Sequence, residues 1–474
     1  MKKIIAGMLM LLHTATAHAF CGFYVAKADT KIFNQASQVI MVHDGTRNII
    51  TMSNDFKGNV KDFAMVVPVP VALAKKDIRV RNQQLFAKLD AYSSPRLVEY
   101  FDENPCEPQY RVYKNMPMAA MADRASVKEE VISAKKLGVR IEARYAVGEY
   151  DILILSAKQS NGLKIWLNDN GYKIPEGANE VLDPYIRSNM KFFVAKVNIN
   201  RHNESGFQAL NPIQIEFNSP KFMLPIRLGM ANSSGQQDLI IYTLSTRGRI
   251  ECTNYRTVKM PTGQNMPEFI QNDFGKFYGD VFRRAWLREG QSAVFQEYAW
   301  DVSPRNFMKC DPCVAEAPDY NDLREAGVDW MNDNNNYPYG ENGNKGVFFT
   351  RLHVRYDREH FAQDLVFQET PDKRNWQTRF VLHHPAAGSF NCEAGAQYVN
   401  STIDRRRDEL KQLQQLAGWS ATRYPNYPYT WEGQQYRRLR QGSWSLNWPL
   451  MLLFVGLQVS VIGFILARKK QQAH

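Results

Sequence analysis

Compositional extremes and long internal repeats are absent from the sequence, and this absence excludes several classes of protein. Of the 474 residues, 44% are hydrophobic and 23% are charged, which is close to the usage of ordinary globular proteins. Global disorder, a collagen helix and a long coiled coil are therefore excluded. The sequence also has no Gly-x-Ser-x-Gly nucleophile elbow and no phosphate-binding P-loop. It identifies no catalytic residue and implies no cofactor.

A first apolar run lies at the N-terminus. Lys2 and Lys3 precede an apolar segment, residues 4–12, that is too short to span a bilayer, and residues 17–19 have the small-x-small pattern of a signal-peptidase site. The sequence therefore predicts a signal peptide over residues 1–19. Phe20 stands before Cys21, where a lipidation signal has a small residue, so a lipoprotein is not favoured.

A second apolar run lies near the C-terminus. Residues 450–467 are interrupted only by Gln458 and Ser460, and at about 1.5 Å per residue they cover roughly 27 Å of a ~30 Å hydrocarbon core. The sequence therefore predicts one transmembrane helix over residues 448–467. Its flanks carry the expected interfacial aromatic and basic side chains, namely Trp444, Trp448, Arg468, Lys469 and Lys470.

The orientation of this span follows from the signal peptide. A basic cluster at residues 437–440 makes the flanking charges ambiguous, but a cleavable signal places residues 20–447 outside the cytoplasm, on the periplasmic side, and the tail 468–474 inside. The exported part carries 54 basic and 48 acidic residues, a net charge of +6. Outside the cytoplasm this surplus faces anionic lipids or cell-wall polymers, so nucleic acid is not expected as a partner.

The cysteines agree with this address. All six lie in the exported part, and an even number in an oxidising compartment favours three disulfides, although the spacing does not select their pairing. They do not form the two close pairs of a zinc ribbon. The candidates are Cys21, Cys106, Cys252, Cys310, Cys313 and Cys392.

Cys310 and Cys313 form a CxxC motif with an internal proline, which is frequent in thiol oxidoreductases. Redox chemistry favours a thiol at a helix N-terminus, and neither a helix start nor a βαβ unit is predicted around the motif. We therefore expect oxidised, structural cysteines here, paired with each other or with Cys252 or Cys392.

Hydrophobic periodicity predicts an α+β fold with antiparallel sheets and a few packed helices. The expected strands are residues 38–42, 48–53, 62–69, 150–155, 190–198, 212–217, 222–230, 238–244, 292–302 and 347–356, with a hairpin turn at 43–46. The expected helices are residues 162–168, 267–288 and 394–417. These segments divide into an α+β region over 20–300, a second region over 301–420 that contains the CxxC motif, and a Tyr/Pro-rich stalk over 421–447.

Candidate metal ligands have no convincing spacing, and no metal site is predicted. His353, His360, Asp364 and Glu369 are expected to be solvated surface groups, because their spacing matches no zinc helix motif. His383 and His384 are adjacent, so on a strand they face opposite ways. A methionine cluster (Met116, Met118 and Met121) and the loop 332–344 are expected to be filler and an ordinary loop rather than copper and calcium sites.

Several short segments, taken in order, resemble one family. They are residues 21–23, 62–70, 147–151, 166–175, 224–228 and 364–367. Together they resemble bacterial proteins of the domain-of-unknown-function 2330 family over residues 20–395. The resemblance implies an exported bacterial protein, often membrane-attached, and supplies no established activity or catalytic residue.

Two functional hypotheses follow. The first is a non-enzymatic envelope protein, anchored by its C-terminal helix, that binds an envelope protein or a cell-wall component. The alternative is a membrane-tethered enzyme, either a hydrolase or a thiol oxidoreductase that uses Cys310 and Cys313.

Overall fold

The computed structural model describes residues 23–26, 37–53, 63–107, 139–158, 160–170, 178–198, 201, 210–232, 235–304, 306, 308–331 and 345–431. The predicted signal peptide, the transmembrane segment with its flanking residues, Cys21, the methionine cluster and the loop 332–344 lie outside these residues. Among the helices that are described, none is long and apolar enough to cross a membrane.

The chain forms two compact units, each built from segments that are far apart in sequence. Unit 1 contains residues 1–96, 122–262 and 282–379, and unit 2 contains residues 97–121, 263–281 and 380–474. This division differs from the expected boundary at residue 300. The physical reason is that the strands ending at Asp301 and beginning at Phe348 pair in one sheet, which ties the two sides of that boundary together.

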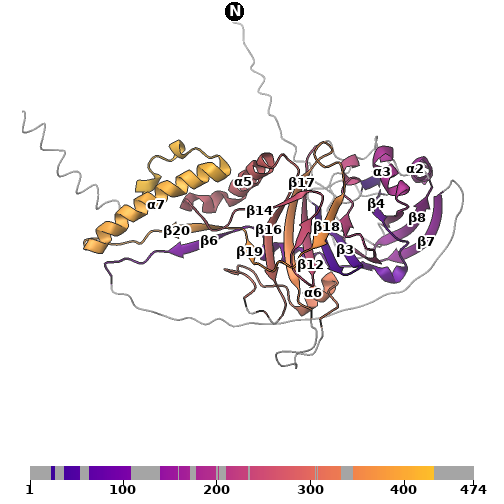
Figure 1. The fold of residues 1–474 in the computed structure, drawn as a ribbon, viewed down its shortest axis with the longest axis horizontal. Helices are drawn as coiled ribbons and strands as arrows, with labels where there is room; N and C mark the ends of the chain where they lie inside the picture. The colour runs from indigo at the N-terminus through magenta and orange to yellow at the C-terminus, as the bar shows by residue number, and fades with distance from the viewer. Residues whose placement is uncertain are drawn as a thin grey trace, which may run out of the picture. The chain divides into compact units, whose positions relative to one another are not determined.

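A large mixed sheet forms the centre of unit 1 (Figure 1). Most neighbouring strands are antiparallel, but β12–β2 and β14–β16 are parallel. In spatial order the strands are β14 (Arg256–Lys259), β16 (Ala293–Asp301), β17 (Phe348–Tyr356), β12 (Gln237–Ser245), β2 (Ser37–Asp44), β3 (Arg47–Ser53), β10 (Ile213–Asn218) and β5 (Ile78–Val80), and β19 (Trp376–Gln377) pairs with β16.

A five-stranded antiparallel sheet packs on one face of the large sheet. Ile152 and Ile154 face the core shared by the two sheets, whereas Leu155 and Leu163 belong to the core beneath the covering helices. Both faces are therefore buried, which explains the nearly continuous apolar runs of its strands. The strands are β1 (Phe23–Ala26), β4 (Phe63–Val69), β9 (Lys191–Val197), β8 (Tyr150–Ala157) and β7 (Val139–Val147), covered by α2 (Ser160–Asp169) and α3 (Ala178–Arg187).

The opposite face of the large sheet is covered by α1 (Gln84–Ser93) and α6 (Tyr320–Ala326). Their apolar side chains join Ile40, Val42 and Phe349 of the sheet in a separate core. Unit 1 thus has helices, sheet, sheet and helices as successive layers. A small sheet of β11 (Met223–Leu224), β18 (Leu365–Glu369) and β13 (Ile250–Cys252) closes one margin of the core between the two sheets.

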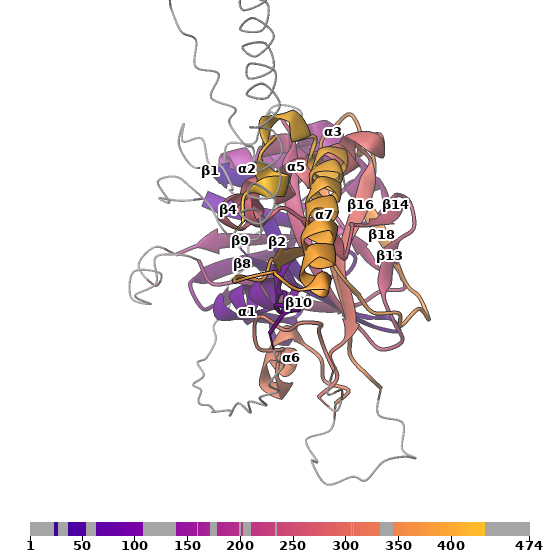
Figure 2. The ribbon, with the colours of Figure 1, turned by 90° about the vertical axis from the view of Figure 1, so that its left-hand side faces the viewer.

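Unit 2 is organised around the long helix α7 (Glu393–Ala417), which is shown in Figure 2 with the short turns that follow it. These turns, η4 (Ala421–Arg423) and η5 (Tyr427–Tyr429), pack on α7, and Tyr427 is buried. Part of the segment expected as a stalk is therefore folded. The sheet β15 (Gln264–Met266), β20 (Arg379–His384) and β6 (Arg96–Phe101), the turn η3 (Glu268–Asp273) and the first half of α5 (Phe274–Arg288) complete the unit.

The mixed α+β class is confirmed, and several individual elements are found where the pattern placed them. The hairpin β2–β3 turns at Gly45, whose φ of 64° is a conformation that glycine adopts without strain. The strand expected over 222–230 is wrong in extent, because only Met223 and Leu224 pair. Helices α1, α3 and α6 were not predicted.

The disulfide Cys106–Cys392 fixes the start of α7. The Cα atoms are 5.8 Å apart, and the Cys392 sulfur also accepts a hydrogen bond from the Gly395 N–H at 3.2 Å, so it caps the helix. Gly395 lies so close to the bridge that a Cβ atom there would be 2.8 Å from Cys106 Sγ and 2.6 Å from the carbonyl oxygen of Phe390.

We predict that Gly395→Ala destabilises unit 2 by about 1–3 kcal/mol, because the added methyl group overpacks this junction. The matched control is Gly279→Ala in α5, where a Cβ would meet nothing within 4 Å and alanine should stabilise the helix by up to about 1 kcal/mol. Urea unfolding of the two variants measures the difference. Equal effects of the two substitutions would contradict the packing at Gly395.

Candidate functional site

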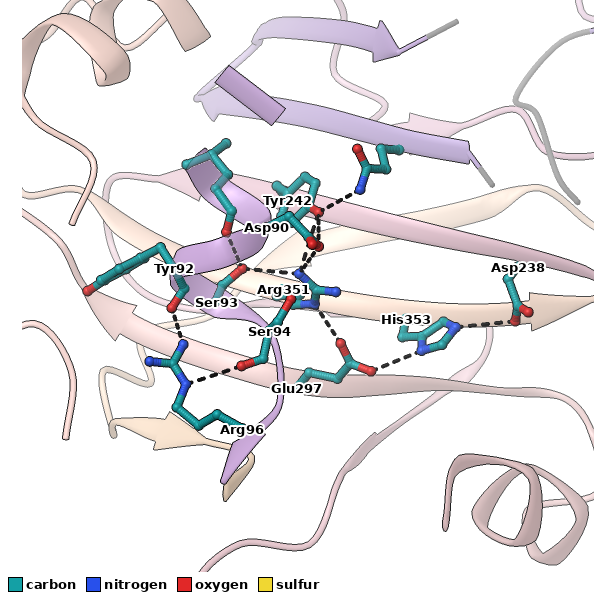
Figure 3. Close-up of polar contacts among 12 residues, drawn as sticks. Asp90, Tyr92, Ser93, Ser94, Arg96, Asp238, Tyr242, Glu297, Arg351 and His353 are labelled. Carbon is teal, nitrogen blue, oxygen red and sulfur yellow. Dashed lines mark hydrogen bonds and ion pairs between the residues drawn. The ribbon is translucent and has the colours of Figure 1, made fainter. Parts of the chain in front are cut away.

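A chain of alternating charges is buried between α1 and three central strands of unit 1 (Figure 3). Arg351, His353 and Arg355 occupy every second position of β17, so their side chains share the face of the sheet that α1 covers. Acidic side chains from α1, β16 and β12 lie between them. In order, the chain runs Asp90, Arg351, Glu297, His353, Asp238 and Arg355.

Arg351 links the helix to the sheet. Its Nη1 is 2.6 Å from Asp90 Oδ1, and its Nε is 2.6 Å from Glu297 Oε2. Its guanidinium group also lies 5.4 Å from the centre of the Tyr242 ring. Burial alone would lower the pKa of Arg351, but the neighbouring acidic groups outweigh burial and raise it. Arg351 is therefore a permanent buried cation.

Glu297 lies on a β-bulge. Gln296 is paired with Leu352 and Tyr298 with Arg351, which leaves Glu297 as the additional residue of β16. Only 1% of Glu297 is exposed, and its carboxylate lies against Arg351 Nε and, through Oε1, 2.9 Å from His353 Nδ1. The bulge thus carries a carboxylate that is fully withdrawn from water and has two basic neighbours.

His353 lies between two carboxylates. Its Nε2 is 3.2 Å from Asp238 Oδ1, and its ring stacks on Phe282 with the ring centres 3.8 Å apart. Burial alone would lower the pKa of His353, but Glu297 and Asp238 raise it overall. Asp238 shows the opposite balance: burial alone would raise its pKa, but His353 and Arg355 lower it. Arg355 donates two hydrogen bonds to Asp238, at 2.8 and 2.7 Å.

The arrangement favours a charged imidazolium. A metal ligand or a general base needs a ring nitrogen with a free lone pair, whereas both ring nitrogens of His353 face carboxylate oxygens. The groups therefore neutralise one another across β12, β16 and β17. This geometry supports a structural role, in which ion pairs hold α1 and the three strands together.

The four residues considered as metal ligands do not converge, and the expectation that they are solvated is wrong for three of them. The side chains of His353, Asp364 and Glu369 are largely withdrawn from solvent. Asp364 accepts hydrogen bonds from Tyr185 OH at 2.6 Å and from the backbone N–H of Ile226 at 3.0 Å. His360 Nδ1 lies 2.8 Å from Asp357 Oδ1, and Glu369 Oε2 accepts a hydrogen bond from Arg247 at 2.7 Å. Among the described residues, no three acidic, histidine or cysteine side chains are grouped as metal ligands.

His383 and His384 have separate partners in unit 2. His384 Nε2 is 2.8 Å from Glu99 Oε2, whereas His383 Nδ1 is 3.7 Å from Asp102 Oδ1. This separation agrees with the alternation expected for adjacent residues of a strand.

The CxxC motif forms a disulfide between Cys310 and Cys313, whose Cα atoms are 5.1 Å apart. The motif lies in a loop, and the next helix, α6, begins at Tyr320. Cys310 is 6% exposed, while Cys313 is exposed at the surface. Cys252 is buried and has no disulfide partner in the described part of the chain.

Side chains of α1, β16 and residue 96 donate hydrogen bonds to the backbone carbonyls of the CxxC loop. The carbonyl oxygen of Lys309 accepts hydrogen bonds from Tyr92 OH and Tyr298 OH, both at 2.6 Å. The carbonyl of Pro312 accepts from Arg96, whose guanidinium group also contacts the carbonyl of Tyr92. Burial raises the pKa of Tyr92 to about 12, so its hydroxyl stays protonated and donates. One end of α1 therefore contacts both the charge chain, through Asp90, and the disulfide loop, through Tyr92.

A second buried polar cluster lies in unit 2. Arg406 of α7 pairs with Glu268 and donates to the carbonyl oxygen of Tyr427 at 3.0 Å, while Tyr427 OH donates to Glu409 Oε2 at 2.7 Å. Burial raises the pKa of Glu409 to about 7, against the lowering effects of Tyr427, Arg405 and Arg406. These contacts fasten the segment after α7 to the helix.

Sequence reasoning missed both clusters. A signal was present in β17, where Arg351, His353 and Arg355 alternate with apolar residues, and in β16, where Gln296 and Glu297 interrupt an apolar run. Such a pattern would ordinarily indicate a sheet with one solvated face. Here the polar positions lie beneath α1 and α5, which the strand pattern itself does not reveal.

We predict that Arg351→Met destabilises the protein by about 3–5 kcal/mol, because it removes one of the two cationic partners of the buried Glu297 carboxylate. The control is Arg256→Met, which removes an exposed arginine that pairs with Glu289 and should change stability by at most about 1 kcal/mol. Adding Glu297→Gln to Arg351→Met should recover part of the loss. Urea unfolding midpoints measure these effects, and similar values for the two single variants would contradict the fastening role.

The pKa of His353, raised in the folded state, predicts a pH dependence. The stabilisation from its positive charge is fully present below the unfolded pKa of about 6.5 and is lost as the pH rises through the higher folded pKa. The difference in unfolding free energy between the wild type and His353→Gln should therefore shrink from pH 6 to pH 9. The comparison cancels the other titrating groups, and a difference that is constant or grows with pH would contradict the assignment.

Comparison with known proteins gives a family but no characterised relative. The sequence model of a family described as "Uncharacterized protein conserved in bacteria (DUF2330)" matches residues 15–368. This range contains the charge chain and the CxxC motif, and it ends before α7. The comparisons with curated proteins and with solved structures found no match.

Proposed function

The chain belongs to the bacterial DUF2330 family, and we propose that it is an exported envelope protein, anchored by one C-terminal membrane span, whose ectodomain is a binding or structural module. In this proposal residues 1–19 direct export, residues 448–467 cross the membrane and the basic tail stays in the cytoplasm. The family's printed description names no activity, so the proposal rests on the chain's own features.

The observation that carries the proposal is the pairing of the cysteines. Four of the five cysteines in the described part are joined, and Cys106–Cys392 connects residues 286 positions apart. Disulfides form and persist in oxidising compartments and are rare in the bacterial cytoplasm. This pattern supports a folded ectodomain outside the cytoplasm.

The end of the described chain also supports an anchor. Tyr427 is bonded to Glu409 and to Glu268 N–H, so the chain is fastened to α7 shortly before it continues toward Trp444. The Arg406 guanidinium group lies 4.5 Å from the Tyr427 ring centre and 5.1 Å from that of Trp431. The chain is therefore folded against α7 up to residue 431, and sixteen residues separate this point from the predicted span.

A binding or structural role is favoured by the state of the polar groups. The charges from Asp90 to Arg355 are engaged with one another, which suits stabilisation better than substrate chemistry. The net positive charge of the exported region suits an anionic wall component or an acidic surface of an envelope protein. In-cell cross-linking followed by mass spectrometry would identify such a partner. Hydrolase activity of the purified protein, lost on a single substitution, would instead favour an enzyme.

Two fusions test the topology. A reporter attached after residue 474 should be active only when it is of a cytoplasmic type, and a reporter attached after residue 447 only when it depends on export. The second fusion should also leave the membrane fraction, because it lacks the predicted span. An export-dependent reporter that works after residue 474 would overturn the proposed orientation.

A further inference from the structure

The two cysteines of the CxxC loop differ in their exposure to solvent. Cys313 is exposed, whereas Cys310 is 6% exposed and belongs to the core beneath α1. Thiol–disulfide exchange needs a thiolate to approach one sulfur of the bond directly. Only Cys313 offers such an approach from solvent, and Cys310 is placed as the departing sulfur.

The loop does not need the disulfide to keep its shape. Trp300 Nε1 donates to the Met308 carbonyl at 2.7 Å, and Arg379 donates to the Asp311 carbonyl at 2.6 Å. Tyr92, Tyr298, Arg96 and Gln377 hold the carbonyls of residues 309, 311 and 312 in the same way. A bridge across two intervening residues constrains an unfolded chain little. The bond can therefore open and close while the loop stays in place.

The surroundings of the loop suit exchange with a protein. Met308 and Val314, on either side of the motif, are 67% and 58% exposed, so apolar side chains flank the accessible sulfur. Arg96 and Arg379 donate to carbonyls of the loop, and Arg379 also pairs with the Asp311 carboxylate at 3.1 Å, so among the described residues Arg96 supplies the unpaired positive charge at the loop's carbonyls. Positive charge favours the thiolate form of a cysteine, which makes it a better leaving group.

We propose that Cys310–Cys313 is an exchange site for a protein dithiol, in which Cys313 forms the mixed disulfide and Cys310 is the departing sulfur. A partner thiolate attacks Cys313 Sγ; the new S–S bond forms as the Cys310–Cys313 bond breaks, and the electron pair remains on Cys310, which takes up a proton. The partner's second thiolate then attacks the partner's own sulfur and releases Cys313. Two electrons and two protons pass from the dithiol to this protein, and the reverse steps reduce the partner's disulfide and restore the Cys310–Cys313 bond.

Cys106–Cys392 is the internal control for this proposal, because both of its cysteines are partly buried and its sulfur caps α7. The full-length protein in detergent is treated with dithiothreitol, quenched with a maleimide at intervals and mapped by mass spectrometry. Cys310–Cys313 should open at least tenfold faster than Cys106–Cys392, with an unchanged near-UV circular dichroism spectrum. Faster opening of Cys106–Cys392, or loss of the fold together with the CxxC bond, would overturn the proposal.

The attacked sulfur is identified with a thioredoxin that lacks its second active-site cysteine. Its adduct with the wild-type protein should map to Cys313, and an adduct at Cys310 would overturn the assignment. Cys310→Ala and Cys313→Ala form a matched pair of variants. The Cys313 thiol that remains in Cys310→Ala should react with maleimide at least tenfold faster than the Cys310 thiol that remains in Cys313→Ala. Reduced glutathione serves as a small-thiol probe, and an adduct with glutathione but none with thioredoxin would exclude a protein partner. The wild-type measurements decide the question even if a variant fails to fold.

Discussion

The bulge in β16 is the local constraint on which the centre of unit 1 depends. In a regular strand, Phe295 and Glu297 would share one face while Tyr298 and Trp300 would share the other. The additional residue changes this phase, so Glu297, Tyr298 and Trp300 all lie on the side of α1. Glu297 meets Arg351 and His353, while Tyr298 and Trp300 hold the carbonyls of the CxxC loop. This one change of register therefore positions both Glu297 in the charge chain and the side chains that contact the CxxC loop.

The bulge also decides which charges can be buried. A carboxylate taken out of water costs several kcal/mol unless cations and hydrogen bonds replace its hydration. Arg351 and His353 supply both, but each is itself a buried cation and needs further partners, which are Asp90 and Asp238. Both ends of the charge chain are partly exposed, at Asp90 on one side and at Asp238 and Arg355 on the other. The chain of charges is long because Glu297 is fully buried, and the signs of the charges alternate because each buried charge needs a partner of opposite sign.

The sequence predicted those parts of the fold that depend on local pattern. β2, β3, β16, β17 and α7 have strong periodicity, and each was found where it was expected. The sequence could not predict how β12 pairs in parallel with β2, because their paired residues lie about 200 positions apart and both strands are apolar on both faces. It also could not predict the bulge, since the letters of β16 fit a regular strand equally well.

The same reasoning explains why the polar residues of β17 were misjudged. A histidine that alternates with apolar residues has the same pattern whether water or a helix covers it, and only the position of α1 and α5 distinguishes the two. For the CxxC motif, the pairing of Cys310 with Cys313 is one of the alternatives that the sequence left open. Here the stability of the loop comes from hydroxyl, indole and guanidinium donors that belong to other elements. These donors hold the backbone of the loop and not its sulfur atoms, so the conformation of the loop does not rest on the disulfide alone.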